Sequence, residues 1–574
     1  MADERERKIL AEVVEKVGSY EKRASSFMSE IAEWTDMWRI KPHARRSGSF
    51  SNPRTTEFFR ACNSLSILMY RMLTAQEPFF KIFPMDPAAG YEDVRNLESV
   101  LNQQMRAAKY KKYLLKACHY VVPFGTVIAE ESWRTVGVNR FRNIPTTTFR
   151  PRVLDQIAFD TGAIEIDDAS WISTQDVVTK GQLHELMRDA KEGKNRAWDV
   201  SALEDAINKD ETSSTINQQV LDRLRRANPH DNHDEVIRRS GELIMYYGKL
   251  DTLNDGFEYV VGVYNRHTLV RFHANNFQHG RRQFRVGKWK DFTGQLGDGV
   301  GSLLGHEARS LDTTERATRD SHAFAAYNMW KIKRNSVLAE DLKIRPNNFI
   351  EVDDQNDITP MDTNSGAIGA GQTLLEFLQQ NFRNAAGAPD ELQAIASEAV
   401  TATQASLAQN SAQRNVAVVA EQFAEPMIKE HLEVMHANNS MLLRSPIDIE
   451  RAGLAKRVYP RDINFDADFL AKTVTDKDYT PKRLTELQNL LMTLISTKSS
   501  HPDQMNISIL PIVKEIAHQL NVNPDEVLQA PSAPAGFGQG ELDDLGAGTL
   551  PPQGGEPTNE PVMDTPVGPT IVGP

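Results

Sequence analysis

A long stretch without glycine constrains the fold of this chain more than any other feature of its sequence. Between Ile395 and Met435 there is no glycine and one proline, Pro426. At about 1.5 Å per residue, a helix from Ser397 to Ala437 would be about 60 Å long, which exceeds most compact domains. We expect it to bridge modules or pack against copies of itself, and we expect Pro426 to kink or end it. Alanines on one helical face recur every three or four residues, at positions 396, 399, 402, 405, 408 and 412.

Length and charge limit what the rest of the chain can be. Its 574 residues are too many to fold around a single hydrophobic core, so about three to five modules are expected. Acidic residues outnumber basic ones by 78 to 66, and this argues against a dedicated nucleic-acid binder. The acidic balance is still compatible with a protein that lets nucleic acid slide past without binding it tightly. Cys62 and Cys118 alone predict a reducing compartment without disulfides. No signal-peptide core or membrane-spanning apolar run is present.

The first 300 residues combine helices and strands. Apolar residues at steps of three and four predict an amphipathic helix over residues 55–75. From Thr148 the spacing of apolar residues changes from that of a helix to that of extended strands. Polar segments typical of helices return over residues 181–227. Alternating segments at 242–249 and 257–272 predict antiparallel strands, joined by the turn Asn254-Asp255-Gly256. Residues 150–290 therefore predict a mixed α+β module.

A two-helix stalk is predicted next. Residues 303–330 form a charged helix with a thin apolar stripe, which is typical of a helix that crosses solvent or packs against identical neighbours. A short strand-rich unit over residues 343–352 follows, and then a second helix over residues 373–383. Small residues at 385–390 break this helix. The simplest geometry is a pair of helices tipped by a β element.

The C-terminal part is predicted to pack against an earlier module, and its last residues contain few apolar side chains. Residues 463–470 predict a strand that pairs with an earlier module, and residues 481–497 and 505–520 predict two helices. The tail, 531–574, has nine prolines, nine glycines and six acids, and no lysine, arginine or histidine. It has too little apolar surface to offset chain entropy, so disorder is expected.

No motif in the sequence predicts catalysis or metal binding. The glycine-rich run from Gly297 to Gly305 has leucine at 304, where a dinucleotide-binding fingerprint needs glycine, and no Walker Gly-Lys-Ser/Thr follows. A flexible entry into the next helix is the better interpretation. No Cys or His spacing suits zinc, and no nucleophile elbow occurs. The sequence therefore favours a structural or assembly role without a cofactor.

The order of these parts resembles the portal (head-to-tail connector) proteins of short-tailed DNA bacteriophages. The likeness covers residues 20–480, and three local stretches share it. They are Val121-Val122-Pro123-Phe124-Gly125-Thr126, Gly297-Asp298-Gly299-Val300-Gly301 and Glu398-Ala399-Val400-Thr401-Ala402-Thr403-Gln404-Ala405. Residues 181–240 and the acidic tail are less similar to that family.

The resemblance implies a mainly α-helical α+β fold with the parts of a portal subunit. These would be a wing (1–295), a first stem helix (296–330), a clip (331–365), a second stem helix (366–385), a tunnel loop (386–398), a long wing helix with a returning strand (399–480), crown helices (481–530) and the tail (531–574).

The resemblance also implies roles for individual residues. Candidates for the DNA channel and tunnel loop are Arg383, Gly387, Ala388, Pro389, Asp390 and Glu391. Candidates for docking at the clip are Lys331, Lys333, Arg334, Lys343 and Arg345. Candidates for contacts between neighbouring stems are Glu307, Arg309, Asp312, Glu315, Arg316 and Arg319.

A portal of this kind would form a ring, usually of twelve subunits, at one capsid vertex of the virion. It would assemble in the host cytoplasm, away from membranes, and pass double-stranded DNA without reading its sequence. Its partners would be the terminase large subunit, scaffolding and major capsid proteins, and tail adaptor or nozzle proteins. Two alternatives stay open: another head or tail adaptor, and an α-rich enzyme with a deep pocket of perturbed titratable groups.

Overall fold

The computed structural model divides the chain into two units, Met1–Arg483 and Leu484–Pro574. It describes residues 2–42, 52, 54–74, 78–87, 89–139, 142–192, 197–208, 240–275, 282–292, 294–326, 330–332, 358–360, 365–387, 415–451, 454–472, 489 and 492. Every helix and strand with described bounds belongs to the first unit. Apart from residues 489 and 492, the predicted crown helices lie outside the described residues, as do the acidic tail and the alanine-rich part of the long helix before residue 415.

Helices dominate the N-terminal part. They are α1 (Ala2–Arg23), α2 (Ser25–Trp38), α3 (Glu57–Leu73), α4 (Tyr91–Ala107) and α5 (Tyr110–Phe124). The helix predicted over residues 55–75 is confirmed as α3, which buries Phe58, Cys62, Leu65 and Met69 at the expected spacing. The α5 helix ends at Gly125, whose φ of 79° lies in the left-handed region that glycine tolerates.

Two antiparallel sheets follow. The first has the order β3-β2-β9, with β2 (Thr126–Asn139), β3 (Arg142–Arg152) and β9 (Phe284–Lys288). The second has the order β4-β5-β6-β7-β8. Its strands are β4 (Ile157–Phe159), β5 (Trp171–Thr179), β6 (Ser240–Lys249), β7 (Glu258–Tyr264) and β8 (Thr268–Ala274). The mixed module predicted from the change of period is therefore present.

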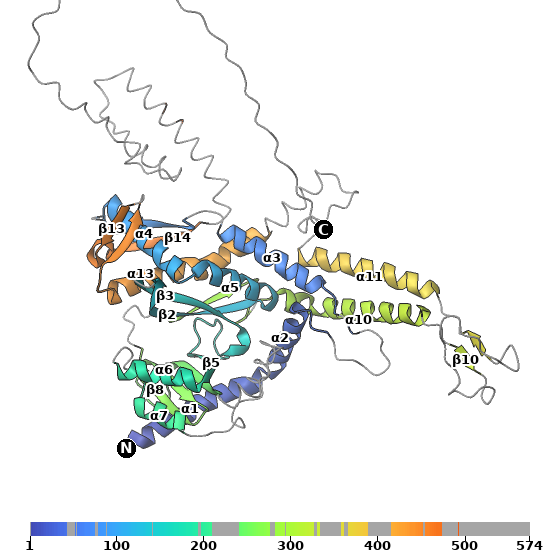
Figure 1. Ribbon diagram of the computed structural model, residues 1–574, viewed down its shortest axis with the longest axis horizontal. Helices are drawn as coiled ribbons and strands as arrows, with labels where there is room; N and C mark the ends of the chain where they lie inside the picture. Colours follow the sequence, from blue (N-terminus) through green and yellow to red (C-terminus); the bar gives the residue numbers. More distant parts are fainter. Residues whose placement is uncertain are drawn as a thin grey trace, which may run out of the picture. The chain divides into compact units, whose positions relative to one another are not determined.

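The prediction for residues 257–272 needs one correction. A second turn at Asn265 and Arg266, both with positive φ, splits this segment into β7 and β8. The polar segment after residue 180 forms α6 (Lys180–Lys191) and α7 (Val200–Asn208). Both helices pack on one face of the five-stranded sheet through a separate apolar cluster that includes Leu183 and Leu203 (Figure 1).

The long helix continues past Pro426 instead of ending there. Residues 415–424 are helical, η4 (Glu425–Lys429) is a π-helical turn, and α13 (Glu430–Leu442) completes the run. Proline cannot donate the usual backbone hydrogen bond, and a π turn is one way to accommodate this loss within a helix. The predicted kink is therefore a local widening of the helix.

The chain then returns to the N-terminal part, as the sequence predicted. Strand β14 (Ala467–Ala471) pairs with β1 (Phe80–Pro84), which the sequence analysis did not identify. Between α13 and β14, β12 (Ile447–Arg451) and β13 (Leu454–Val458) form a hairpin. One apolar cluster joins the N-terminal helices, both sheets and the helix around Phe423. No helix among the described residues is long and apolar enough to cross a membrane.

Candidate functional site

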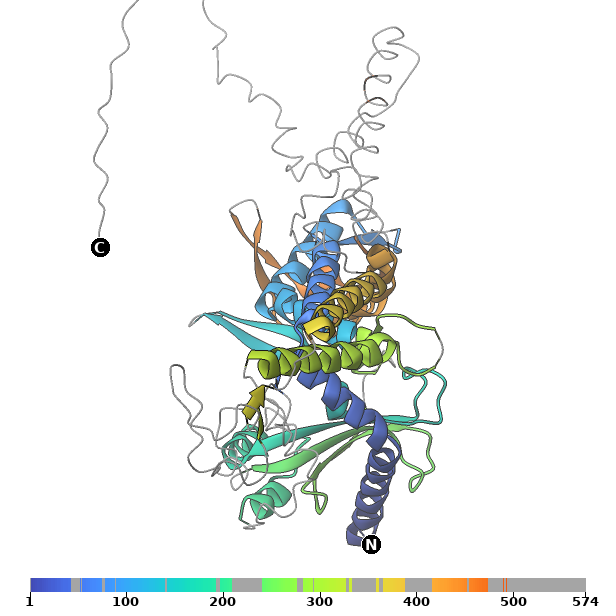
Figure 2. The ribbon, with the colours of Figure 1, turned by 90° about the vertical axis from the view of Figure 1, so that its right-hand side faces the viewer.

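Two helices and a small β element form the candidate functional site. Helix α10 (Val300–Ala326) leads to β10 (Trp330–Ile332), which pairs with β11 (Ile358–Pro360) before α11 (Ser365–Ala386) returns. The two helices lie side by side, with β10 at their far end (Figures 1 and 2). The first helix was predicted to reach Trp330, but Trp330 belongs to β10, and the described helix is Val300–Ala326.

A backbone contact fixes the start of α10. The amide of Trp289 donates to the carbonyl oxygen of Gly125, and the amide of Gly297 donates to Oγ1 of Thr126, both at 2.7 Å. A Cβ atom on Gly125 would overlap the backbone of Gly297 and Gly299, so no side chain fits there. The run Gly297–Gly301, which resembles a phosphate loop, therefore has a packing role against the Pro-Phe-Gly turn.

A second contact fixes the same end of the helix pair. Asp312 of α10 is 2% exposed and accepts a hydrogen bond of 2.7 Å from the backbone amide of Thr55. On α11, Arg383 donates to both carboxylate oxygens of Glu57, at 2.7 and 2.9 Å. Phe382 is buried with its ring centroid 6.5 Å from that of Phe58. Both helices are thus held by the start of α3. These contacts, together with the packing of Gly297–Gly301 on Gly125, are called the base.

Beyond the base, the helix pair is largely exposed. Arg309, about one turn before Asp312, still binds Glu33 of α2 at 2.8 and 2.7 Å, whereas Arg319 binds Glu315 of its own helix at 2.6 Å. On α11, Leu374 and Phe377 are 49% and 58% exposed. Large apolar side chains that stay in water on neighbouring turns of a helix are typical of a surface that another protein covers.

The predicted stem residues lie on α10, and several have partners in the same chain. Asp312 and Arg309 contact the body, Glu315 pairs with Arg319, and Nε of Arg316 donates to the carbonyl oxygen of Asp312. Glu307 lies 3.1 Å from His306. Their contact with a neighbouring subunit stays a prediction.

Most of the predicted tunnel-loop and clip residues are not described. Ala388, Pro389, Asp390, Glu391, Lys333, Arg334, Lys343 and Arg345 lie outside the described residues. Gly387 ends α11 with a φ of 69°. Lys331 is the central residue of β10. The guanidinium of Arg383 is held by Glu57, so its predicted role at the channel stays a prediction.

No sequence motif predicts the buried ionic joint that lies where the long helix crosses the first sheet. The carboxylate of Glu131 on β2 accepts hydrogen bonds from Nδ1 of His431 at 2.5 Å and from Nε of Arg285 at 3.1 Å. Arg285 also donates to Glu430 at 3.0 Å. Burial lowers the pKa of Arg285, but Glu131 and Glu430 more than offset this, so its pKa lies above its ordinary value.

An aromatic stack completes this joint. The ring of Tyr110 lies parallel to that of His431, with centroids 4.9 Å apart, and its hydroxyl donates to the carbonyl oxygen of Met427 in the π turn. Burial and the charge of Glu131 raise the pKa of Tyr110 well above its ordinary value, so the hydroxyl keeps its proton. The contacts lock the long helix onto β2 and α5.

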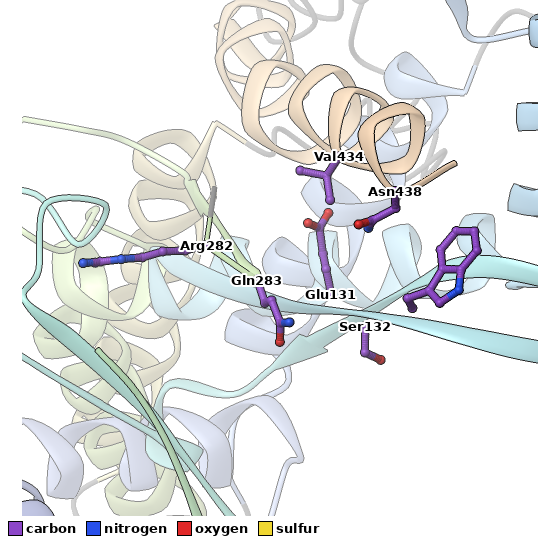
Figure 3. Close-up of a pocket in the computed structure, with 7 residues that line it drawn as sticks. Glu131, Ser132, Arg282, Gln283, Val434 and Asn438 are labelled. Atoms are coloured by element: carbon purple, nitrogen blue, oxygen red, sulfur yellow. The ribbon is translucent and has the colours of Figure 1, made fainter. Parts of the chain in front are cut away.

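The cavity at this joint is too small for a substrate. It measures about 10 Å³, which is room for about one water molecule. Figure 3 shows the carboxylate of Glu131 pointing toward α13, from which Val434 and Asn438 extend, whereas Ser132 points to the opposite side of β2. Oδ1 of Asn438 is buried without a hydrogen-bond partner among the described residues. A single bound water fits these features.

A larger, open cleft of about 650 Å³ lies between the loop at Asp167, β9 and the π turn. Each basic group that lines it is paired with an acid: Arg282 with Glu258, Arg285 with Glu430, and Lys429 with Glu425. Within the described part of the chain, no group of three or more His, Cys, Asp or Glu residues is placed to hold a metal ion. Cys62 and Cys118 are free thiols, and burial raises the pKa of each far above its ordinary value.

Comparison with known proteins gives one family. The family model described as phage SU10 portal protein matches residues 129–539, which is more than half of the chain. The matched range includes both sheets, α10, α11 and α13. No curated protein matches the chain.

Proposed function

Because the chain belongs to the phage SU10 portal protein family, we propose that its copies form a ring at one vertex of the capsid. DNA crosses the central channel of this ring during packaging and ejection. The observation that carries the proposal is the family match over residues 129–539 together with the helix pair that it contains. A portal is a structural component of the virion, so no catalytic role is assigned to any residue.

In this proposal, α10 and α11 are the stem helices and the β10–β11 pair belongs to the clip. Residues 1–295 and 399–480 form the wing, 386–398 the tunnel loop, and 481–530 the crown. The clip is the docking face for the terminase large subunit and later for tail adaptor or nozzle proteins. The wing faces scaffolding and major capsid proteins. The division of the helix pair into a fixed base and an exposed remainder supports this assignment.

Ring formation would also cover the exposed apolar side chains of α11. Leu374 and Phe377 are 49% and 58% exposed, so covering the rest of each against a neighbouring stem would contribute about half of the roughly 1.5–3 kcal/mol expected for burying a whole side chain. Exposed ion pairs would add only about 0.2–1 kcal/mol each. A closed ring repeats each contact and leaves no open end. The net charge of −12 suits a channel that must not grip the phosphate backbone.

The proposal is tested by negative-stain electron microscopy of the purified chain, with mass photometry alongside. We expect rings with a central hole and a mass of about twelve 64.5 kDa subunits. A single species of one or two chains at every salt and protein concentration would contradict assembly by the chain alone.

A further inference from the structure

Basic side chains gather at one corner of this acidic protein. Residues 99–129 contain no aspartate or glutamate, and their basic residues gather near the turn from α4 to α5: Arg106, Lys109, Lys111, Lys112 and Lys116. The chain as a whole has a net charge of −12. A local run of this kind needs its own explanation, because the average charge of the chain predicts the opposite.

The fold turns these basic side chains outward. Helix α5 buries the face that carries Tyr110, Leu114 and Val121, which leaves Lys112 and Lys116 exposed about 6 Å apart along the helix axis. Arg106 in the last turn of α4 and Lys109 in the connecting turn are also exposed. Lys109 has a φ of 55°, so the chain reverses sharply there and brings both helix ends to one corner.

These four cations have no acidic partner in the described part of the chain, in contrast to several basic groups that are paired. Among the described residues, no carboxylate forms an ion pair with Arg106, Lys109, Lys112 or Lys116. Elsewhere, for example, Arg266 binds both Glu21 and Glu242. The ammonium group of Lys116 lies 5.3 Å from the ring centroid of Tyr120, a contact that positions the charge without neutralising it.

The start of β1 extends the same surface. Phe79 stacks on Tyr110 with centroids 5.9 Å apart, so β1 begins beside the first turn of α5. Lys111 lies 5.8 Å from the ring of Phe79. Lys81 lies 5.0 Å from the ring of Phe83. The aromatic rings hold these ammonium groups close to the protein and leave them charged.

We propose that this α4–α5 corner binds the phosphate backbone of double-stranded DNA without sequence preference. Arg106, Lys109, Lys112 and Lys116 supply the charges. The contact is separate from the stem and clip, and it concerns the surface of a single chain, so it does not depend on ring formation.

The chemistry of the corner favours a phosphate backbone over an acidic protein segment. Protein interfaces are enriched in aromatic residues and depleted in lysine, whereas the corner is mainly lysine. Within residues 99–129 no large apolar side chain is markedly exposed; on the adjoining β1, Phe83 is 39% exposed, with the ammonium group of Lys81 5.0 Å from its ring. Phosphate contacts need no apolar anchor, and lysine serves them as a point charge.

The test is a DNA-binding assay on the full chain. A labelled random duplex is titrated at several salt concentrations between about 50 and 200 mM, and the affinity is followed by fluorescence anisotropy. The variant is Lys109→Gln, Lys112→Gln and Lys116→Gln together. Its control is Lys8→Gln, Lys22→Gln and Lys191→Gln, which removes the same charge from three other exposed positions. All six side chains are exposed, so both variants should keep the melting temperature of the parent.

We expect the corner variant to bind DNA about tenfold more weakly, and the slope of log K against log salt to fall by about 2 to 3, since each neutralised phosphate contributes about 0.9. The control should stay within about twofold of the parent. Equal affinity of the two variants, or no DNA binding by the parent at the lowest salt, would overturn the proposal. Mass photometry of both variants distinguishes DNA binding from a contact with a neighbouring copy. If the corner variant loses assembly but keeps its DNA affinity, the corner binds a neighbouring copy, and the proposal is wrong.

Discussion

The two ends of the α10–α11 pair differ in how they are held. At the base, Asp312 and Arg383 are bonded to the start of α3, and Gly299 packs directly on the backbone of Gly125. Farther along, Leu374 and Phe377 are about half exposed, and Arg319 binds only a residue of its own helix. The base contacts tie the helix pair to other parts of the fold, whereas the outer contacts, such as Arg319 with Glu315 and Gln372 with His322, stay within the pair.

This difference separates two tasks. The base sets the direction in which both helices leave the body, because buried polar groups and backbone contacts tolerate little displacement. The outer part contributes little to the stability of the single chain and keeps its side chains available to a partner. Substitutions at the base should therefore destabilise the chain, and substitutions on the outer part should change assembly alone.

The largest effect is expected from Gly125→Ala. The added Cβ overlaps the backbone of the 297–301 run, and the φ of 79° disfavours any residue other than glycine. We expect a loss of about 3–5 kcal/mol in the free energy of unfolding, measured by urea denaturation. Gly18→Ala is the control, because nothing lies within 4 Å of its new Cβ and alanine favours a helix. Equal stability of the two variants would show that the backbone contact is not tight.

A smaller loss is expected from Arg383→Met. The substitution keeps the aliphatic part of the side chain but leaves the carboxylate of Glu57, which is 3% exposed, without its main ion pair. Arg60 lies 3.4 Å from Glu57 and offsets part of the loss. We expect a loss of about 2–3 kcal/mol in the free energy of unfolding, measured by urea denaturation. In the double variant Glu57→Gln with Arg383→Met, much of the stability should return; a double variant no better than Arg383→Met would contradict this.

On the outer part, Arg319→Gln should cost about 0.3–0.5 kcal/mol in the free energy of unfolding, because an exposed pair four residues apart on a helix contributes little. The measurement is the same urea denaturation. A loss above about 1 kcal/mol would mean that this region is held as firmly as the base.

The double variant Leu374→Ser with Phe377→Ser should have almost no effect on the unfolding of the single chain, since both side chains are about half exposed. Its effect should fall on assembly, with rings replaced by smaller species in mass photometry. Glu376→Gln with Gln380→Glu, on the same exposed helix and without net change of charge, is the control. Intact rings in the serine variant would contradict an interface at these residues.

Sequence reasoning predicted local patterns well and long-range partners poorly. The spacing of Phe58, Cys62 and Leu65 shows which face of α3 is buried, because a helix repeats locally. The same reasoning does not show what that face contacts. Arg383 and Glu57 are 326 residues apart, and His431 and Glu131 are 300 apart, so neither pair leaves a periodic signal.

The base contained a partial signal that the sequence analysis did not combine. The Pro-Phe-Gly turn and the 297–301 run were each identified, but their glycines fit one another only because the fold brings the two backbones together. The π turn at Pro426 was likewise only half predicted. Proline indicates an irregularity, whereas the hydroxyl that donates to the carbonyl oxygen of Met427 in this turn belongs to Tyr110, 317 residues before Met427.

The most direct test of the central claim is a cryo-electron microscopy reconstruction of the assembled chain. The account predicts a ring in which α10 and α11 of every copy form the channel wall, with Leu374 and Phe377 covered by the neighbouring copy and Arg383 still bound to Glu57. A ring in which this helix pair points outward into solvent, away from the channel, would contradict the account.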